Sequence, residues 1–277
     1  MKNSIKQRLL SAVIILLLLA AVVLFNGVFP LALNIMLAAI SVLGVWEIFT
    51  ALQLTRQIAL IVPSTLLAGV LPFLPDPLSR GVAFFIYSIL LFGAMIRYHD
   101  TLTFREVAVI YSMAILIPTA LQTLIPLRNL GHPHGMFYVI VTIFAAWATD
   151  AGAYVFGSRF GKHKLCPNIS PKKTVEGAVG GIVINVLIML LFGFIFQHLY
   201  WNSTVHVNYV VLGVIGAVGA VLSMLGDLSF SIIKRSCHIK DFSELIPGHG
   251  GILDRFDSVI FVAPFVYLLA QVFPIVL

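Results

Sequence analysis

The segment from Gly177 to Tyr200, "GAVGGIVINVLIMLLFGFIFQHLY", decides the class of fold. It carries no Asp, Glu, Lys or Arg over the length of one membrane crossing, which takes about 20 residues. Because the hydrocarbon core offers no water to satisfy backbone N–H and C=O groups, such a segment must be helical. The whole chain is 60% hydrophobic and only 10% charged, with a mean hydropathy of +1.05. We therefore predict an all-α polytopic membrane protein.

Apolar runs of similar length recur along the 277 residues and predict about nine transmembrane helices. We place them at 9–26, 29–46, 57–74, 81–97, 105–126, 135–157, 177–200, 207–228 and 258–276. With these spans, all of the 17 lysines and arginines except Arg80 and Arg128 fall on the side of the N-terminus. The positive-inside rule then predicts a cytoplasmic N-terminus. The first span lacks a clean cleavage site, so we interpret it as a retained helix rather than a signal peptide.

Most of the formal charge of +6 follows from this topology, and some of it is expected to meet anionic lipid headgroups or a polyanionic substrate. No nucleic-acid partner is therefore expected. Cys166 and Cys237 lack a metal-type spacing and fall on the reducing side, which argues against a zinc site or a disulfide. Most of the acidic residues lie in the second half. We expect 1–130 to form N-terminal transmembrane helices and 131–277 to form a C-terminal catalytic transmembrane region, with its site on the cytoplasmic side.

Three polar blocks interrupt the second half, and the first is "FAAWATDAGAYVFGSRFGKHK". It places Asp150 inside an expected span. A charged group there costs roughly 2.5–3.5 kcal/mol on insertion scales, so it usually faces a cavity, a partner or an ion. The plainer alternative is a carboxylate that reaches the interface or pairs with a lysine of another helix.

The second block is "NISPKKTVEGAVGG". Ser170 or Thr174 is placed to cap the helix that follows. Lys172 and Lys173 are adjacent, so on a turn one can reach an active site while the other meets a lipid phosphate. The alternative is a positively charged loop with a capped helix and no further role.

The third block follows the eighth expected span. On a continuous helix Asp227, Ser231 and Lys234 share one face, and Arg235 lies one position further round.

Next comes "KDFSELIPGHGGILDRFD", residues 240–257, in which Pro247 and the glycines prevent a regular helix. Such a turn exposes backbone N–H groups as an anion cradle, with His249 at its centre. Asp254 and Asp257 are three residues apart and face the same way on a helix that begins near the end of the block. Two carboxylates beside a glycine-rich turn, with lysines and arginines opposite, suit a divalent cation that holds phosphates. The alternative for the two acids is a surface ion pair at a helix start.

These residues resemble a known family. Residues 231–257 read S-x-x-K-R-x4-K-D-x-S-x2-I-P-x-H-G-G-x2-D-R-x-D, which is similar to the signature of the phosphatidate cytidylyltransferases, also called CDP-diacylglycerol synthases. The upstream stretches "DAGAYVFGSRFGK" and "ISPKKTVEG" also resemble family blocks and stand in the family's order. The resemblance covers roughly 140–260, whereas the first 130 residues match only as a run of membrane helices.

The resemblance implies a reaction in which CTP and phosphatidic acid give CDP-diacylglycerol and pyrophosphate, with a divalent cation, usually Mg²⁺. It also implies a bacterial inner (cell) membrane protein, with its site facing the cytoplasm, that forms a homodimer. The residues fit such a reaction, because a phosphate nucleophile is already anionic and needs charge neutralisation and in-line placement more than a base.

On this basis we assign roles to the polar residues. The expected metal ligands are acids from separate segments: Asp227 and Asp254 first, then Asp257 and Asp150. The groups expected to neutralise the triphosphate and the leaving pyrophosphate are Lys234, Arg235, Lys240 and Arg255. His249 is expected to donate to a phosphate oxygen or to orient a ligand, and Asp241 is also expected among the catalytic residues. The remaining substrate-binding positions are Lys172, Lys173, Thr174, Ser231, Gly248, Gly250 and Gly251.

Two other functions compete with this interpretation. A secondary transporter would use the intramembrane carboxylates as coupling sites, but the charge gathers on one membrane face and no inverted halves are visible. A CDP-alcohol phosphotransferase would carry a clustered Asp-Gly, Ala-Arg and further spaced aspartates, and that pattern is absent from the sequence.

Overall fold

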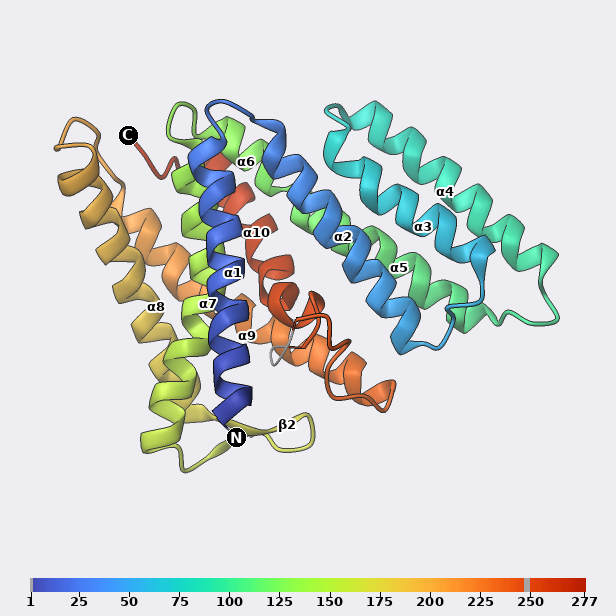
Figure 1. Ribbon diagram of the computed structural model, residues 1–277. Coiled ribbons are helices and arrows are strands. Elements are labelled where there is room, and N and C mark those ends of the chain that lie inside the picture. Colours follow the sequence, from blue (N-terminus) through green and yellow to red (C-terminus); the bar gives the residue numbers. More distant parts are fainter. Residues whose placement is uncertain (1, 247–249) are drawn as a thin grey trace. The chain divides into compact units, whose positions relative to one another are not determined.

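The computed structural model describes residues 2–246 and 250–277, and helices dominate them (Figure 1). The helices, in chain order, are α1 (Lys2–Phe25), α2 (Leu31–Ala51), α3 (Ile58–Val70), α4 (Pro77–Arg97), α5 (Phe104–Gln122), α6 (Leu124–Leu130), α7 (Gly135–Phe160), α8 (Val175–Ile195), α9 (Tyr209–Ser236) and α10 (Leu253–Val272). A 3₁₀ turn, η1 (Leu71–Phe73), extends α3, and a π turn, η2 (Phe196–Tyr200), extends α8. The predicted all-helical, polytopic architecture is confirmed.

Within the described residues, seven helical segments are long and apolar enough to cross a membrane. They are Leu31–Ala51, Pro77–Arg97, Phe104–Leu130, Gly135–Phe160, Val175–Tyr200, Tyr209–Ser236 and Leu253–Val272. The first and third of the nine expected spans coincide instead with shorter apolar helices, Leu16–Phe25 and Ile58–Phe73. The charge-free segment from Gly177 to Tyr200 lies in α8 and η2. Its outward side chains, such as Leu187 and Leu191, are more than half exposed, as a lipid-facing surface requires.

The chain forms two compact units. Unit 1 contains the residues up to Gln122 together with Ser236–Arg255, and unit 2 contains Thr123–Arg235 together with Phe256–Leu277. The segment Ser236–Arg255, which carries most of the predicted signature, thus packs with the N-terminal helices. The prediction that the catalytic region lies in 131–277 concerns chemistry and stays a prediction.

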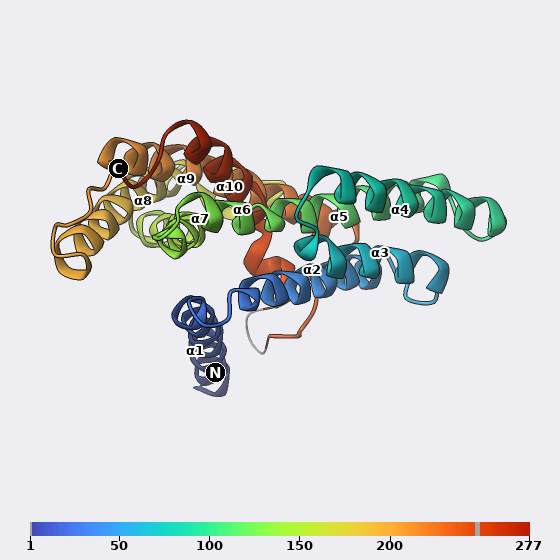
Figure 2. The same ribbon diagram turned by 90° about the horizontal axis from the view of Figure 1, so that it is seen from above.

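Unit 1 is a group of helices in which α2, α3 and α5 contact one another and α4 packs on α3 and α5 (Figures 1 and 2). Its core is aliphatic and aromatic, and buried side chains such as Leu37, Phe49 and Leu121 are fully enclosed. Polar side chains tie the helices where they cross. The Ser64 hydroxyl lies 3.1 Å from the Tyr87 hydroxyl, which links α3 to α4.

Unit 2 is built on α7 and α8, which pack along their length through small residues. A Cβ atom at Gly181 would lie 2.9 Å from the Thr149 carbonyl oxygen, and one at Gly177 would lie 2.8 Å from that of Ala153. The glycines of "VEGAVGG" therefore let the backbones of α7 and α8 approach each other closely. No larger residue fits at either position without moving α7 away from α8.

A buried amide joins a third helix to this pair. The Nδ2 atom of Asn185 on α8 lies 2.9 Å from the Ala145 carbonyl oxygen, 3.0 Å from Thr149 Oγ1 and 3.0 Å from the Gly216 carbonyl oxygen of α9. Asn185 is fully buried, so these partners replace the water that its NH₂ group loses on burial. The start of α10 joins α9 in the same way, since the Ser258 hydroxyl donates to the Ser223 carbonyl oxygen at 3.2 Å.

Candidate active site

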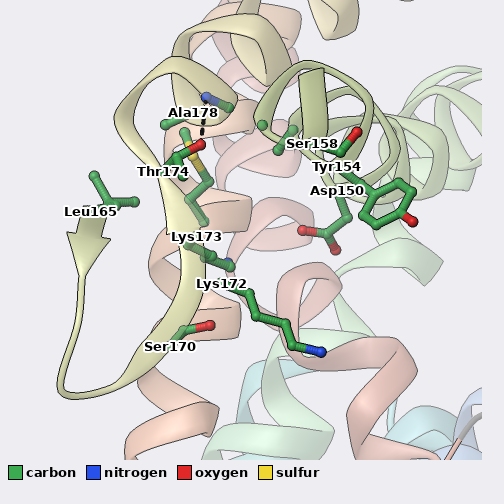
Figure 3. Close-up of a pocket in the computed structure, with 13 residues that line it drawn as sticks. Asp150, Tyr154, Ser158, Leu165, Ser170, Lys172, Lys173, Thr174 and Ala178 are labelled. Carbon is green, nitrogen blue, oxygen red and sulfur yellow. Dashed lines mark hydrogen bonds between the residues drawn. The ribbon is translucent and has the colours of Figure 1, made fainter. Parts of the chain in front are cut away.

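A cavity of about 420 Å³ lies in unit 2, within the size range of small-ligand sites (Figure 3). Its walls come from α7, from the start of α8, from Met224 of α9 and from a short hairpin between α7 and α8. The hairpin consists of β1 (Lys164–Cys166) and β2 (Ser170–Thr174), which pair antiparallel. The sequence had suggested only a turn here. In Figure 3, Asp150 of α7 faces the strand that carries Lys172.

The hairpin is fastened to the start of α8 by the carboxylate of Glu176. The backbone N–H of Lys162 donates to Oε2 at 3.0 Å, that of His163 donates at 3.2 Å, and His163 Nδ1 lies 2.6 Å from Oε1. The Val175 N–H in turn donates to the His163 carbonyl oxygen at 2.9 Å. These bonds hold both ends of the hairpin together at the first turn of the helix.

Of the two predicted cap residues, Ser170 and Thr174, the N-cap of α8 is Thr174. Its hydroxyl accepts a hydrogen bond from the Gly177 N–H at 3.1 Å. Glycines of the upstream block leave room for it, because a Cβ atom at Gly157 or Gly161 would lie within 2.9 Å of Thr174 Oγ1. The two upstream blocks are therefore in contact, and together they place the two lysines at the cavity.

Charged side chains from four elements gather beside the cavity. Lys173 of β2 forms an ion pair with Asp227 of α9, and both side chains are about three-quarters buried. Asp257 of α10 is 4% exposed and interacts electrostatically with Asp227, with Asp150 and with Lys234, which is itself 8% exposed. We call these five residues, from the hairpin, α7, α9 and α10, the acid–lysine cluster.

The cluster carries three carboxylates against two ammonium groups. Such a concentration of charge in a low-dielectric region is unfavourable unless opposite charges accompany it. Among the residues that the structure describes, no three His, Cys, Asp or Glu side chains stand together as a complete metal site. The predicted role of these acids as metal ligands therefore stays a prediction.

A second group of predicted site residues belongs to unit 1. There the glycine-rich turn folds around Asp254, whose Oδ2 accepts hydrogen bonds from the N–H groups of Phe242 and Gly251, each at 2.9 Å. Gly250 has φ +84°, and a Cβ atom there would lie 2.8 Å from the same oxygen. The Ile246 N–H donates a hydrogen bond to the Gly250 carbonyl oxygen at 2.9 Å.

The structure thus places the predicted residues in two sets. Unit 2 holds Asp150, Lys172, Lys173, Thr174, Asp227, Ser231, Lys234, Arg235 and Asp257. Unit 1 holds Lys240, Asp241, Gly250, Gly251, Asp254 and Arg255. Within unit 2, α9 is continuous from Tyr209 to Ser236, which is the condition for the predicted common face of Asp227, Ser231 and Lys234. Gly248 and His249 lie outside the described residues, so their roles stay predictions.

Two carboxylates that matter to these sets were absent from the predicted site. Glu176 fastens the hairpin, and Glu47 of α2 contacts the glycine-rich segment in unit 1. The signal for Glu176 was the N-terminal position next to a cap. For Glu47 the only signal was a charged residue inside the apolar run "LGVWEIF".

Comparisons with known proteins extend the resemblance beyond its motifs. Residues 6–273 match the Cytidylyltransferase family. A phosphatidate cytidylyltransferase of Haemophilus influenzae is 34% identical over 94% of this chain and 96% of its own length. One from Bacillus subtilis is 39% identical over 73% of this chain and 72% of its own length. A third, from Staphylococcus epidermidis, is 42% identical over 49% of each chain.

The matched region includes the N-terminal helices, for which the sequence motifs offered no evidence. The resemblance drawn from residues 231–257 is confirmed, and it holds over nearly the whole chain. This protein belongs to the cytidylyltransferase family.

Proposed function

We propose that this protein is a phosphatidate cytidylyltransferase, which converts CTP and phosphatidate into CDP-diacylglycerol and pyrophosphate for phospholipid synthesis. The observation that carries the proposal is the acid–lysine cluster beside a cavity in a membrane-spanning chain. Related proteins of this name are 34% and 39% identical to this one over aligned regions that cover 94% and 73% of its length.

In this reaction a phosphate oxygen of phosphatidate attacks the α-phosphorus of CTP. The bond between that phosphorus and the bridging oxygen of the β-phosphate breaks, and pyrophosphate leaves with the electron pair. Because the nucleophile is already an anion, the protein must mainly neutralise charge and align the two phosphates. Lys172 and Lys173 line the cavity and supply positive charge to the phosphatidate headgroup. Lys234 lies in the same cluster and supplies charge toward the triphosphate.

The walls of the cavity suit a lipid phosphate. Apolar side chains such as Tyr154, Leu165 and Met224 line it together with the two lysines. A headgroup held by the lysines would therefore keep its glycerol and first acyl carbons against apolar surface.

A divalent cation is part of the proposal. The buried Asp257 interacts electrostatically with Asp227 and Asp150, and a cation bound near them would offset the repulsion among these acids. Mg²⁺ is usually held by one or two carboxylates plus phosphate oxygens, so the phosphates of CTP would supply the remaining ligands. When bound, the cation supplies charge stabilisation to the phosphates. Asp254 remains a proposed ligand whose Oδ2 also shapes the glycine turn.

The topology of the proposal follows from the positive-inside rule. It places the N-terminus and both predicted site segments on the cytoplasmic side of a bacterial cell membrane, where CTP is available. We also propose that the protein forms a homodimer.

The test is lipid-dependent release of pyrophosphate. The purified protein in detergent micelles is incubated with labelled CTP, phosphatidate and Mg²⁺, and both products are measured. A transporter would release no pyrophosphate, and a CDP-alcohol phosphotransferase would consume CDP-diacylglycerol instead of forming it.

Asp227→Asn is expected to lower turnover at least about 100-fold, because it removes a proposed cation ligand and the partner of Lys173. Asp100→Asn, at an exposed acid far from any predicted site residue in sequence, is the matched control and should leave turnover unchanged. Near-normal activity of Asp227→Asn, or activity that persists in excess chelator, would remove the cation from the proposal.

A further inference from the structure

The carboxylate of Glu47 is buried in unit 1 and holds the signature segment. Glu47 lies one turn before the end of α2 and is 2% exposed. Its Oε1 accepts a hydrogen bond from the Ser243 hydroxyl at 2.5 Å and one from the Ile252 N–H at 2.8 Å. Its Oε2 accepts one from the Leu253 N–H at 2.8 Å. Both oxygens are therefore committed to the stretch that leads into α10.

The two backbone donors stand at the N-terminus of α10. The first N–H groups of a helix have no partner within the helix, and a negative charge there also interacts favourably with the helix dipole. Such groups are usually capped by a Ser, Thr, Asp or Asn just before the helix. Here the cap is the side chain of another helix, and Leu253 begins α10.

The side chains around the carboxylate show how closely α2 and the segment fit. A Cβ atom at Gly251 would lie 2.5 Å from Glu47 Oε1, so only glycine leaves space for the carboxylate. The side chain of Leu253 is 1% exposed and packs on α2, where a Cβ atom at Gly44 would lie 2.9 Å from its Cδ2. On the other side of the turn, Asp254 accepts the Gly251 N–H. The backbone from Gly251 to Leu253 is thus held between two carboxylates.

We infer that Glu47 is a positioning residue for the signature segment: it fixes the backbone of Gly251–Leu253 and so sets how Asp254 and Arg255 are presented at the start of α10. The inference rests on the proposed function only in assigning the segment a part in the reaction. A charge buried in an apolar helix is costly, and a local cap would serve helix stability as well. The buried contact of Glu47 is explained if the Gly251–Leu253 backbone must be held in one conformation.

The test compares Glu47→Gln with the wild-type chain in two measurements, hydrogen exchange and steady-state kinetics. A glutamine has one acceptor oxygen and one NH₂ group. The Ser243 hydroxyl can turn to accept from that group, but in either orientation an N–H of Ile252 or Leu253 would face it. We expect faster exchange of these two amides, and a fall in kcat of roughly 10- to 100-fold with KM for phosphatidate changed less than about 3-fold.

Glu106→Gln is the matched control. Glu106 belongs to the same unit and also accepts hydrogen bonds at a helix start, from the N–H and the hydroxyl of Thr103 at 2.8 and 2.7 Å. Glutamine is accepted at this capping position. Exchange in residues 250–255 and kcat should both match the wild type in this variant.

Unchanged exchange in Glu47→Gln would overturn the inference, whatever its activity. So would faster exchange with an unaltered kcat. Should that variant fail to fold, Ser243→Ala removes one of the three hydrogen bonds and leaves both backbone donors in place. It should still accelerate exchange at Ile252 and lower kcat a few-fold, and no change in either would contradict the inference. The exchange measurement does not depend on activity, so it separates a wrong role for Glu47 from a wrong proposed reaction.

Discussion

The β1–β2 hairpin of unit 2 and the glycine-rich segment of unit 1 are held by the same device in two different settings. In each, a glutamate side chain accepts hydrogen bonds from two backbone N–H groups. Glu176 stands at the start of α8 and its donors follow the end of α7, whereas the donors to Glu47 stand at the start of α10. Glu176 finds its partners 13 and 14 residues away and keeps 27% of its side chain exposed. Glu47 finds its backbone partners 205 and 206 residues away and is 2% exposed.

This difference in exposure predicts which of the two contacts contributes more to structure and activity. Water can replace a hydrogen bond lost at an exposed carboxylate, whereas a buried donor that loses its partner is left unsatisfied. A buried charge also acts through a lower dielectric. Disruption around Glu47 should therefore cost more than disruption around Glu176, and the following changes test that order.

The largest effect is expected from Gly251→Ala. The new Cβ atom would come within 2.5 Å of one Glu47 oxygen and 2.6 Å of the other, so either the carboxylate or the turn must move. We expect a fall in turnover of about 100-fold, since a displacement near 1 Å is enough for such a loss. Gly93→Ala on α4 is the control, because nothing lies within 4 Å of the Cβ position there. Equal activity of the two variants would mean that the tight fit around Glu47 has no bearing on the reaction.

An intermediate effect is expected from Lys173→Gln. This change removes the positive charge that the hairpin places at the cavity and leaves the contacts of Glu176 with the hairpin intact. The ion pair with the partly buried Asp227 is lost, and a carboxylate in the acid–lysine cluster is left without that partner. We expect kcat/KM for phosphatidate to fall roughly 10- to 100-fold. The thermal midpoint of the protein in detergent, measured in parallel, should change little. A large drop in the midpoint with unaltered kcat/KM would assign Lys173 to stability alone.

The smallest effect is expected from Glu176→Gln. The amide keeps one acceptor for the hairpin N–H groups, and the charge lost is one that solvent already screens. We expect KM for phosphatidate to rise less than about 5-fold and kcat to stay within about 2-fold of the wild type. A loss as great as that of Glu47→Gln would reverse the comparison and show that exposure does not govern the importance of the two contacts.

Much of this architecture could be predicted from sequence because the lipid bilayer restricts the structures that an apolar segment can adopt. The charge-free run from Gly177 to Tyr200 allows only a helix in lipid, and the same constraint repeats along the chain. The cap at Thr174 was also predictable, since a cap depends on residues three positions apart. The motif around residues 231–257 identified the family because its spacing is long and specific.

What the sequence did not predict depends on contacts between distant residues. β1 and β2 are too short to show a strand pattern and are held by their attachment to α8. The pairing of Lys173 with Asp227, although an ion pair was weighed for Asp150, needs the packing of α9 to be known. The sequence around Glu47 does not predict a partner more than two hundred residues later. For the same reason the sequence divided the chain at residue 130 without showing that Ser236–Arg255 packs with the first helices.

The long separation between Glu47 and Leu253 has a consequence for biogenesis. Ribosomes add about 5–20 residues per second, so α2 is synthesised roughly 10–40 s before its capping partners exist. During that interval the Glu47 side chain must be protonated, hydrated or bound by the insertion machinery. Completion of the first unit is thereby delayed until translation nears the last helix.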